Sequence, residues 1–219
     1  MDTIKNSCFL VLLTSITLVA TTACGPPAPD TEPAFQGPPA EVTAAAEPMS
    51  PTDLGALQTY DGTAYRYPLR AQYPGTMAVD DGCGSEGCSF SFTFLPQGNA
   101  LDDAKVRVFL PAGATSAAEQ ESRVTGPNGL IENAGWAVNE IESGGSEQFP
   151  YPWVETVISF SSELKTSGYI LLGETSGQAV EVLLLYPAEM AKAFWPNAQT
   201  VLESLEFEED LLPLTPSNV

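Results

Sequence analysis

Strict alternation of apolar and polar side chains runs through Cys88-Ser89-Phe90-Ser91-Phe92-Thr93-Phe94. Successive side chains of a β-strand point to opposite faces, so the cysteine and the three phenylalanines share one face. A strand of this kind buries one face in a core and turns the other toward solvent, as antiparallel sheets do. The stretch therefore predicts a sheet with a strongly aromatic inner face.

Further strand and helix patterns flank this stretch. β-Branched, aromatic or alternating segments predict strands at about 64–73 and at 105–110, 153–160, 168–173 and 179–186. Helices are expected at 117–123, 187–195 and 197–204, followed by an extended exit at 205–207. Thr115 and Ser116 can cap the first helix, and Pro196 should interrupt the helical structure between the other two. The predicted class is α+β: an antiparallel sheet of five or six strands flanked by two or three helices, similar to an α/β/α sandwich.

The composition excludes several classes of function. The 219 residues contain no histidine, which rules out Ser-His-Asp and Cys-His catalysis and His-ligated zinc. Lys and Arg number 8 against 28 Asp and Glu, a net charge of −20, and such a surface repels nucleic acid. We expect no nucleic-acid partner and no cofactor. The acidic excess also suits a salty habitat, in which case the charge reflects environment rather than function.

The N-terminus has the pattern of an export signal. An apolar run at 8–20 is shorter than the roughly 20 residues that span a bilayer, and small residues at 21–23 precede Cys24. This start resembles a bacterial lipoprotein signal, which implies removal of 1–23 and lipidation of Cys24 at the mature N-terminus. The alternatives are an ordinary signal peptide cut near Ala23 and an uncleaved anchor. Each of the three places the rest of the chain outside the cytoplasm, in a periplasm, a lumen or the cell exterior.

The composition then divides the remaining chain. Residues 24–59 are rich in proline and acidic residues and lack Lys and Arg, which predicts a disordered, lipid-anchored linker. A single globular α+β domain is expected at 60–212, with a flexible tail at 213–219.

Cys83 and Cys88 are the two cysteines left in the predicted domain. In an oxidising compartment such a pair predicts a disulfide, and the neighbouring glycines allow a short loop to close. The loop also fits G-x-G-x-x-G, but a strand follows where a dinucleotide site needs a helix. Asp80, Asp81 and Glu86 could hold Ca²⁺, although a solvated acidic turn is the simpler interpretation, so we expect no metal site.

Two groups of residues are candidates for function. Tyr151 and Trp153 lie in Phe149-Pro150-Tyr151-Pro152-Trp153, where proline-held aromatic rings can act as rigid binding anchors. Four carboxylates flank this stretch and could supply a general acid and base for carbohydrate hydrolysis: Glu140, Glu142, Glu147 and Glu155.

Three further stretches have a recognisable order: Gly135-Trp136, Gly168–Gly173, and Tyr186–Met190 with Phe194 and 201–207. In this order of elements, the chain resembles the PsbP-like family over about 60–210. The resemblance implies a lumenal or periplasmic α/β/α sandwich, lipid-anchored in some members, of a family best known for extrinsic subunits of photosystem II. The implied role is a non-catalytic accessory or assembly module.

Together these patterns predict an exported, lipid-anchored accessory or binding domain that is not an enzyme. Its expected partners are the membrane, through the lipid, and a protein of the cell envelope or thylakoid lumen. Two alternatives remain open: a carboxylate-dependent enzyme acting on carbohydrate, and a binding module for a small ligand or Ca²⁺.

Overall fold

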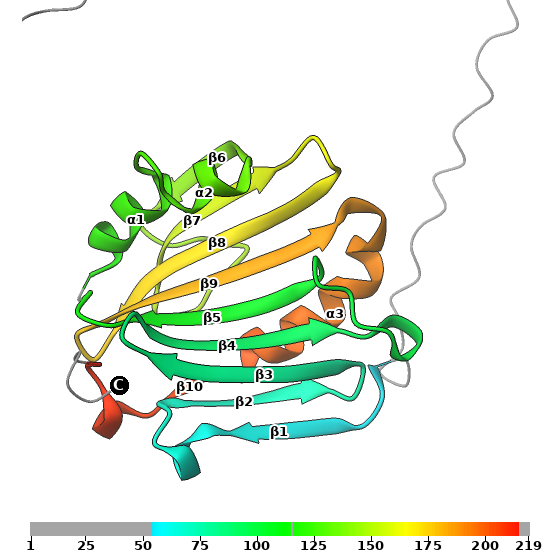
Figure 1. Ribbon diagram of the computed structural model, residues 1–219, viewed down its shortest axis with the longest axis horizontal. Helices are drawn as coiled ribbons and strands as arrows, with labels where there is room; N and C mark the ends of the chain where they lie inside the picture. Colours follow the sequence, from blue (N-terminus) through cyan, green and yellow to red (C-terminus); the bar gives the residue numbers. More distant parts are fainter. Residues whose placement is uncertain (1–53, 115, 215–219) are drawn as a thin grey trace, which may run out of the picture. The chain divides into compact units, whose positions relative to one another are not determined.

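The computed structural model describes residues 54–114 and 116–214. The predicted signal peptide, Cys24, most of the predicted linker and most of the predicted tail lie outside the described residues. The α+β class is confirmed, with every strand pair antiparallel in the described chain. A seven-stranded sheet and a three-stranded sheet pack together with helices (Figure 1).

The larger sheet has the strand order β3-β4-β5-β9-β8-β7-β6. Its strands are β3 (Met77–Gly84), β4 (Gly87–Phe94), β5 (Lys105–Pro111), β6 (Ala137–Ser143), β7 (Val154–Ser161), β8 (Thr166–Thr175) and β9 (Gln178–Pro187). The smaller sheet has the order β1-β2-β10, with β1 (Leu57–Asp61), β2 (Leu69–Pro74) and β10 (Glu206–Phe207). The helices are α1 (Ala117–Thr125), α2 (Leu130–Ala134) and α3 (Ala191–Glu203).

The larger sheet has more strands than the five or six expected, because β3 and β6 lack a clear sequence signal. The outer half of β3 is exposed around Asp80 and Asp81, and all of β6 is exposed. A strand that buries little apolar surface shows little alternation of polarity, so neither could be recognised from its pattern.

The aromatic strand behaves as its alternation predicts. In β4, Cys88, Phe90, Phe92 and Phe94 are at most 5% exposed, whereas Ser89, Ser91 and Thr93 are half-buried on the other face. The phenylalanines meet rings of the smaller sheet and of α3. The ring pairs are Tyr60–Phe90, Tyr73–Phe92 and Phe94–Phe194.

Helices cover both faces of the larger sheet. On the face of the β4 phenylalanines, α3 and the smaller sheet complete the larger core. On the opposite face, α1 and α2 cover β7, β8 and β9 through a second core that includes Ile158, Phe160 and Ile170. Trp136 stacks on Phe160 there, with ring centroids 4.1 Å apart. Figure 1 shows α1 and α2 in front of these strands and α3 behind the sheet.

Two helix predictions have different outcomes. Ser116 caps α1 as expected, because its hydroxyl accepts a hydrogen bond from the Glu119 amide at 3.2 Å. The predicted break at Pro196 is wrong, since α3 runs without interruption through that residue. Phe194, Ala198, Val201 and Leu202 bury one face of α3, and this packing offsets the hydrogen bond that proline cannot donate.

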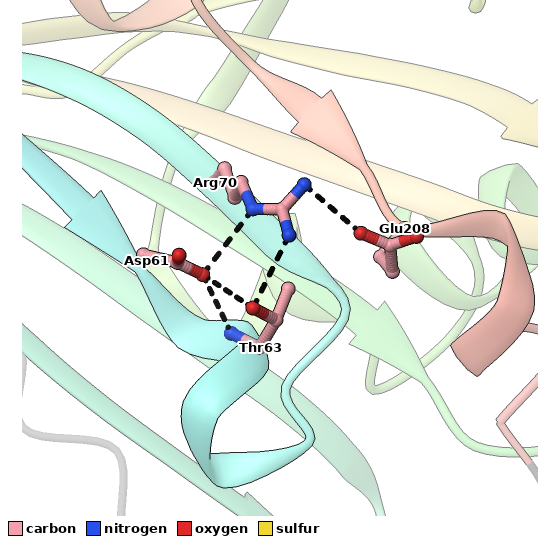
Figure 2. A network of polar contacts seen from close by, with 4 residues as sticks. All are labelled: Asp61, Thr63, Arg70 and Glu208. Carbon is pink, nitrogen blue, oxygen red and sulfur yellow. Dashed lines mark hydrogen bonds and ion pairs between the residues drawn. The ribbon is translucent and has the colours of Figure 1, made fainter.

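A polar network fastens the smaller sheet (Figure 2). The Arg70 guanidinium contacts Asp61 on β1 at 3.3 Å and Glu208, which follows β10, at 3.0 Å. It also donates a hydrogen bond to the Thr63 hydroxyl at 3.3 Å. Hydrogen bonds from the Thr63 hydroxyl and amide, assisted by Arg70, lower the pKa of the Asp61 carboxyl. Exposed pairs of this kind add little stability each, but together they join three chain segments.

Within the described residues, no helix is both long enough and apolar enough to cross a membrane.

Candidate functional site

The predicted disulfide is present between Cys83 and Cys88. The two residues lie directly opposite each other at the end of the β3–β4 hairpin, with Cα atoms 4.0 Å apart. Gly87 pairs with Gly84 at the next position of the hairpin. Its φ is +132°, and a Cβ added there would lie 2.1 Å from the Leu110 carbonyl oxygen, so only glycine fits at this position. The bridge fastens the hairpin, as a structural disulfide does.

The acidic residues of this hairpin do not converge. Asp80 and Asp81 follow one another along β3 and so point to opposite faces, while Glu86 lies in the turn. In the described part of the chain, no group of three or more Cys, Asp or Glu side chains could hold a metal ion. The hairpin therefore offers no built Ca²⁺ site.

Tyr151 and Trp153 lie in the connection between β6 and β7. The amide of Tyr151 donates to the Phe149 carbonyl at 2.8 Å, and its own carbonyl accepts from the Val154 amide at 3.0 Å. Phe149 is 2% exposed and anchors the segment in the core. These contacts and the two prolines fix the path of the chain around Tyr151.

A groove of about 450 Å³ lies between this segment and α3. From the segment, Phe149 and Tyr151 line it, with Glu147 and Gln148 beside them. From the helix it is lined by Trp195, Gln199, Leu202 and Glu203, whose spacing of three to four residues places them on one helical face. This volume falls in the range of small-molecule pockets.

The groove wall continues into the core as a series of ring contacts. Phe149 meets Tyr169 at 5.1 Å, Tyr169 meets Trp195 at 5.7 Å, and Trp195 meets Tyr186 at 5.6 Å between centroids. Edge-to-face aromatic pairs of this kind add to the stability that area burial supplies. The groove is consequently backed by packed rings.

The two predicted anchors have different positions. Their rings stack 6.2 Å apart, but Tyr151 lines the groove and Trp153 turns to Phe207, 5.9 Å away. Burial, followed by the charge of Glu203, raises the pKa of the Tyr151 hydroxyl above its ordinary value. Trp195, Gln199 and Glu203 were not predicted as site residues. They share one face only in a helix that continues through Pro196, as α3 does.

The four predicted carboxylates are all exposed and do not converge on one site. Glu140 and Glu142 border a shallow hollow of about 100 Å³, together with Gln148, Val157, Ser159 and Tyr169. Glu147 lies at the groove beside Tyr151, and Glu155 lies on β7. A hollow of that size is well below the roughly 300 Å³ of the smallest usual ligand pockets, so this pair has no room for a sugar ring.

A buried carboxylate lies on the opposite face of the sheet. Glu181 of β9 is 3% exposed, and its oxygens accept hydrogen bonds from Arg107 at 2.8 Å and from Gln120 of α1 at 2.6 Å. Arg107 is part of β5, the strand that pairs with β9. The trio joins α1 to the sheet.

No protein-family model matches the chain, and no curated protein matches its sequence. Among solved structures, the chain is similar to the solution structure of cyanobacterial PsbP (CyanoP) from Synechocystis sp. PCC 6803. The identity is 11% and the TM-score 0.47, over 74% of this chain and 98% of that one. It is also similar to a crystal structure from Bacteroides thetaiotaomicron VPI-5482, at 18% identity and a TM-score of 0.37, over 70% and 48% of the two chains. Likenesses this low assign no function to the chain.

Proposed function

We propose that this chain is an exported, lipid-anchored binding domain without catalytic activity, which holds a protein partner at the groove beside Tyr151. The observation that carries the proposal is the groove itself. Its aromatic walls are the half-buried Tyr151 and Trp195 and the buried Phe149, and further rings pack behind them. Rigid aromatic side chains around a pocket are typical of the centres of protein interfaces, because they bury large areas at low entropic cost.

Binding explains this region better than catalysis does. The chain has no histidine, and the carboxylates near the groove are exposed rather than set in a dry cleft. General acid–base catalysis needs a titratable group held beside the reacting atom, usually with a pKa tuned by burial. The Tyr151 hydroxyl is protonated at neutral pH, as an ordinary tyrosine is, and burial moves its pKa still farther from neutrality.

Charge indicates the kind of partner. Glu147 and Glu203 are exposed at the groove, and the whole chain carries a net charge of −20. A partner that places an apolar side chain in the groove, with Lys or Arg around it, would match both the walls and the rim. Attraction between opposite charges would also speed the encounter at low salt.

The cysteines support the exported location. A disulfide persists in oxidising compartments such as a periplasm, and the segment that resembles a lipoprotein signal ends at Cys24. A lipid at Cys24 and the proline-rich residues up to the first strand would hold the domain near a membrane of the envelope or thylakoid.

Cross-linking in the native cells tests this proposal. The wild-type, anchored protein should retain a stoichiometric partner after washing, and Tyr151→Ala should lose most of it. Tyr65→Ala is the matched control, because Tyr65 is 74% exposed and lines no part of this groove. A Cys24→Ser variant tests the anchor separately. Equal recovery of the partner by wild type and Tyr151→Ala would contradict the groove as the binding site.

A further inference from the structure

Strand β6 is an open edge of the larger sheet. It is the last strand in the order and pairs on one side only, with β7. All seven of its residues are exposed. In the described part of the chain no strand pairs with its outer side, and Figure 1 places it at the end of the sheet opposite β3. An open edge presents backbone N–H and C=O groups to any strand that can align with it.

One face of β6 is apolar. The register shifts between Val138 and Glu140, and this irregularity brings Val138 opposite Phe160 and Ile141 opposite Ile158. Directly opposed residues share a face, so Val138 and Ile141 extend the apolar surface that α1 and α2 cover farther along the sheet. They remain 42% and 45% exposed.

The other face of β6 is acidic and adjoins the groove. Glu140 lies opposite Ser159 and Glu142 opposite Val157, which places both on the face covered by α3. They border the shallow hollow that Gln148 and Tyr169 also line. Gln148 lines the groove beside Tyr151 as well, so the acidic face and the groove share a boundary.

We propose that β6 binds an extended segment of the partner as an added antiparallel or parallel strand, with alternating basic and apolar side chains. This inference rests on the proposed function, since it assigns the segment to the partner held at the groove. The basic side chains would lie over Glu140 and Glu142, and the apolar ones beside Val138 and Ile141. Backbone hydrogen bonds supply affinity in this mode of recognition, and alternate side chains supply specificity.

A second copy of this chain does not fit the same edge. Pairing β6 with itself would bring two glutamates of each copy together, in a chain whose net charge is −20. Charged residues and bulges on an edge strand oppose such self-association. A basic segment reverses the sign of that interaction, so the same glutamates select the partner.

Peptide binding to the full chain tests the proposal by calorimetry. The probe is an alternating Lys–Val peptide of the length of β6, without an aromatic residue. Its controls are the same peptide with alternate amides N-methylated and an alternating Glu–Val peptide. We expect the Lys–Val peptide to bind, N-methylation to weaken binding at least about tenfold, and the Glu–Val peptide not to bind. No binding of the Lys–Val peptide, or equal binding after N-methylation, would overturn the added strand.

Variants separate the edge from the groove and from general charge. Glu140→Lys/Glu142→Lys should lose the Lys–Val peptide, whereas Asp102→Lys/Glu174→Lys should keep most of it after an equal change in net charge at exposed sites. Tyr65→Ala should bind the peptide as wild type does, because Tyr65 is exposed and lines neither the groove nor the hollow beside β6. An equal loss of peptide binding in both charge variants would overturn the assignment to β6. Recovery of the cellular partner by Tyr151→Ala tests the groove alone, so the two proposals can fail separately.

Discussion

Tyr151 lies between two prolines, and its ring stacks on Trp153 with an angle of 10° between the planes. Backbone hydrogen bonds on both sides of it hold the segment in place. A side chain fixed in this way loses little conformational entropy when a partner arrives, which is why one ring can contribute much of an interface.

The ionisation of Tyr151 reports on its surroundings. Burial and the charge of Glu203 both raise its pKa, so the folded state favours the neutral phenol. The contribution of this group to the free energy of unfolding is therefore fully present below the ordinary tyrosine pKa of about 10. It is lost as the pH rises through the higher pKa of the folded state. Glu203→Gln should lower the pKa of Tyr151 toward its ordinary value, measured by phenolate absorbance. Glu147→Gln is the control and should leave that pKa in place; equal shifts in both variants would contradict Glu203 as the source.

Glu181 is the buried charge on which α1 depends. Arg107→Ala would leave its carboxylate in the core with Gln120 alone. Removing one member of a fully buried pair costs about 3–5 kcal/mol. Because the Arg107 side chain is 31% exposed, we expect a smaller loss, about 2–3 kcal/mol, in urea unfolding. Arg123→Ala should cost at most about 0.5 kcal/mol, because its pair with Glu119 is an exposed one along the helix. Similar losses in the two variants would contradict the buried pair.

At the scale of elements, structure that depends on short-range sequence patterns was predicted, and structure that depends on long-range packing was missed. The β4 alternation, the strands β8 and β9 and the Ser116 cap are set by short-range patterns, and all are confirmed. The continuous α3 was missed because the break expected at Pro196 is overridden by long-range packing. For the same reason, only one side of the groove was predicted. Tyr151 has a local sequence signal, whereas Trp195, Gln199 and Glu203 share a face only when the helix continues through Pro196.

Gly173 of β8 positions the Tyr151 segment. A Cβ there would lie 1.5 Å from the Trp153 carbonyl oxygen, and that carbonyl accepts a hydrogen bond from the Glu174 amide. Gly173→Ala must push the segment away, so we expect a loss of about 1–3 kcal/mol in urea unfolding together with weaker partner binding. Gly82→Ala is the control, because open space surrounds its position and the change should stay within about 0.5 kcal/mol. An unchanged stability of Gly173→Ala would contradict the close approach.

At the scale of the whole molecule, the two faces of the larger sheet differ in kind. One face carries α3, the groove and the acidic side of β6, while the other carries α1 and α2 over a closed core. The proposed contacts thus gather on one face and its edge. Since the chain is strongly acidic, binding there should weaken as salt screens the charges, with a Debye length of about 8 Å at physiological ionic strength.

Photo-cross-linking from inside the groove tests the central claim most directly. A photoreactive residue at Gln199, which is exposed on the groove face of α3, is compared with one at Thr59, which is exposed on β1. In the native cells the account predicts a discrete adduct to one protein from position 199, reduced by Tyr151→Ala, and little or none from position 59. Adducts of equal yield from both positions, or none from position 199, would contradict the groove as the place where this chain meets its partner.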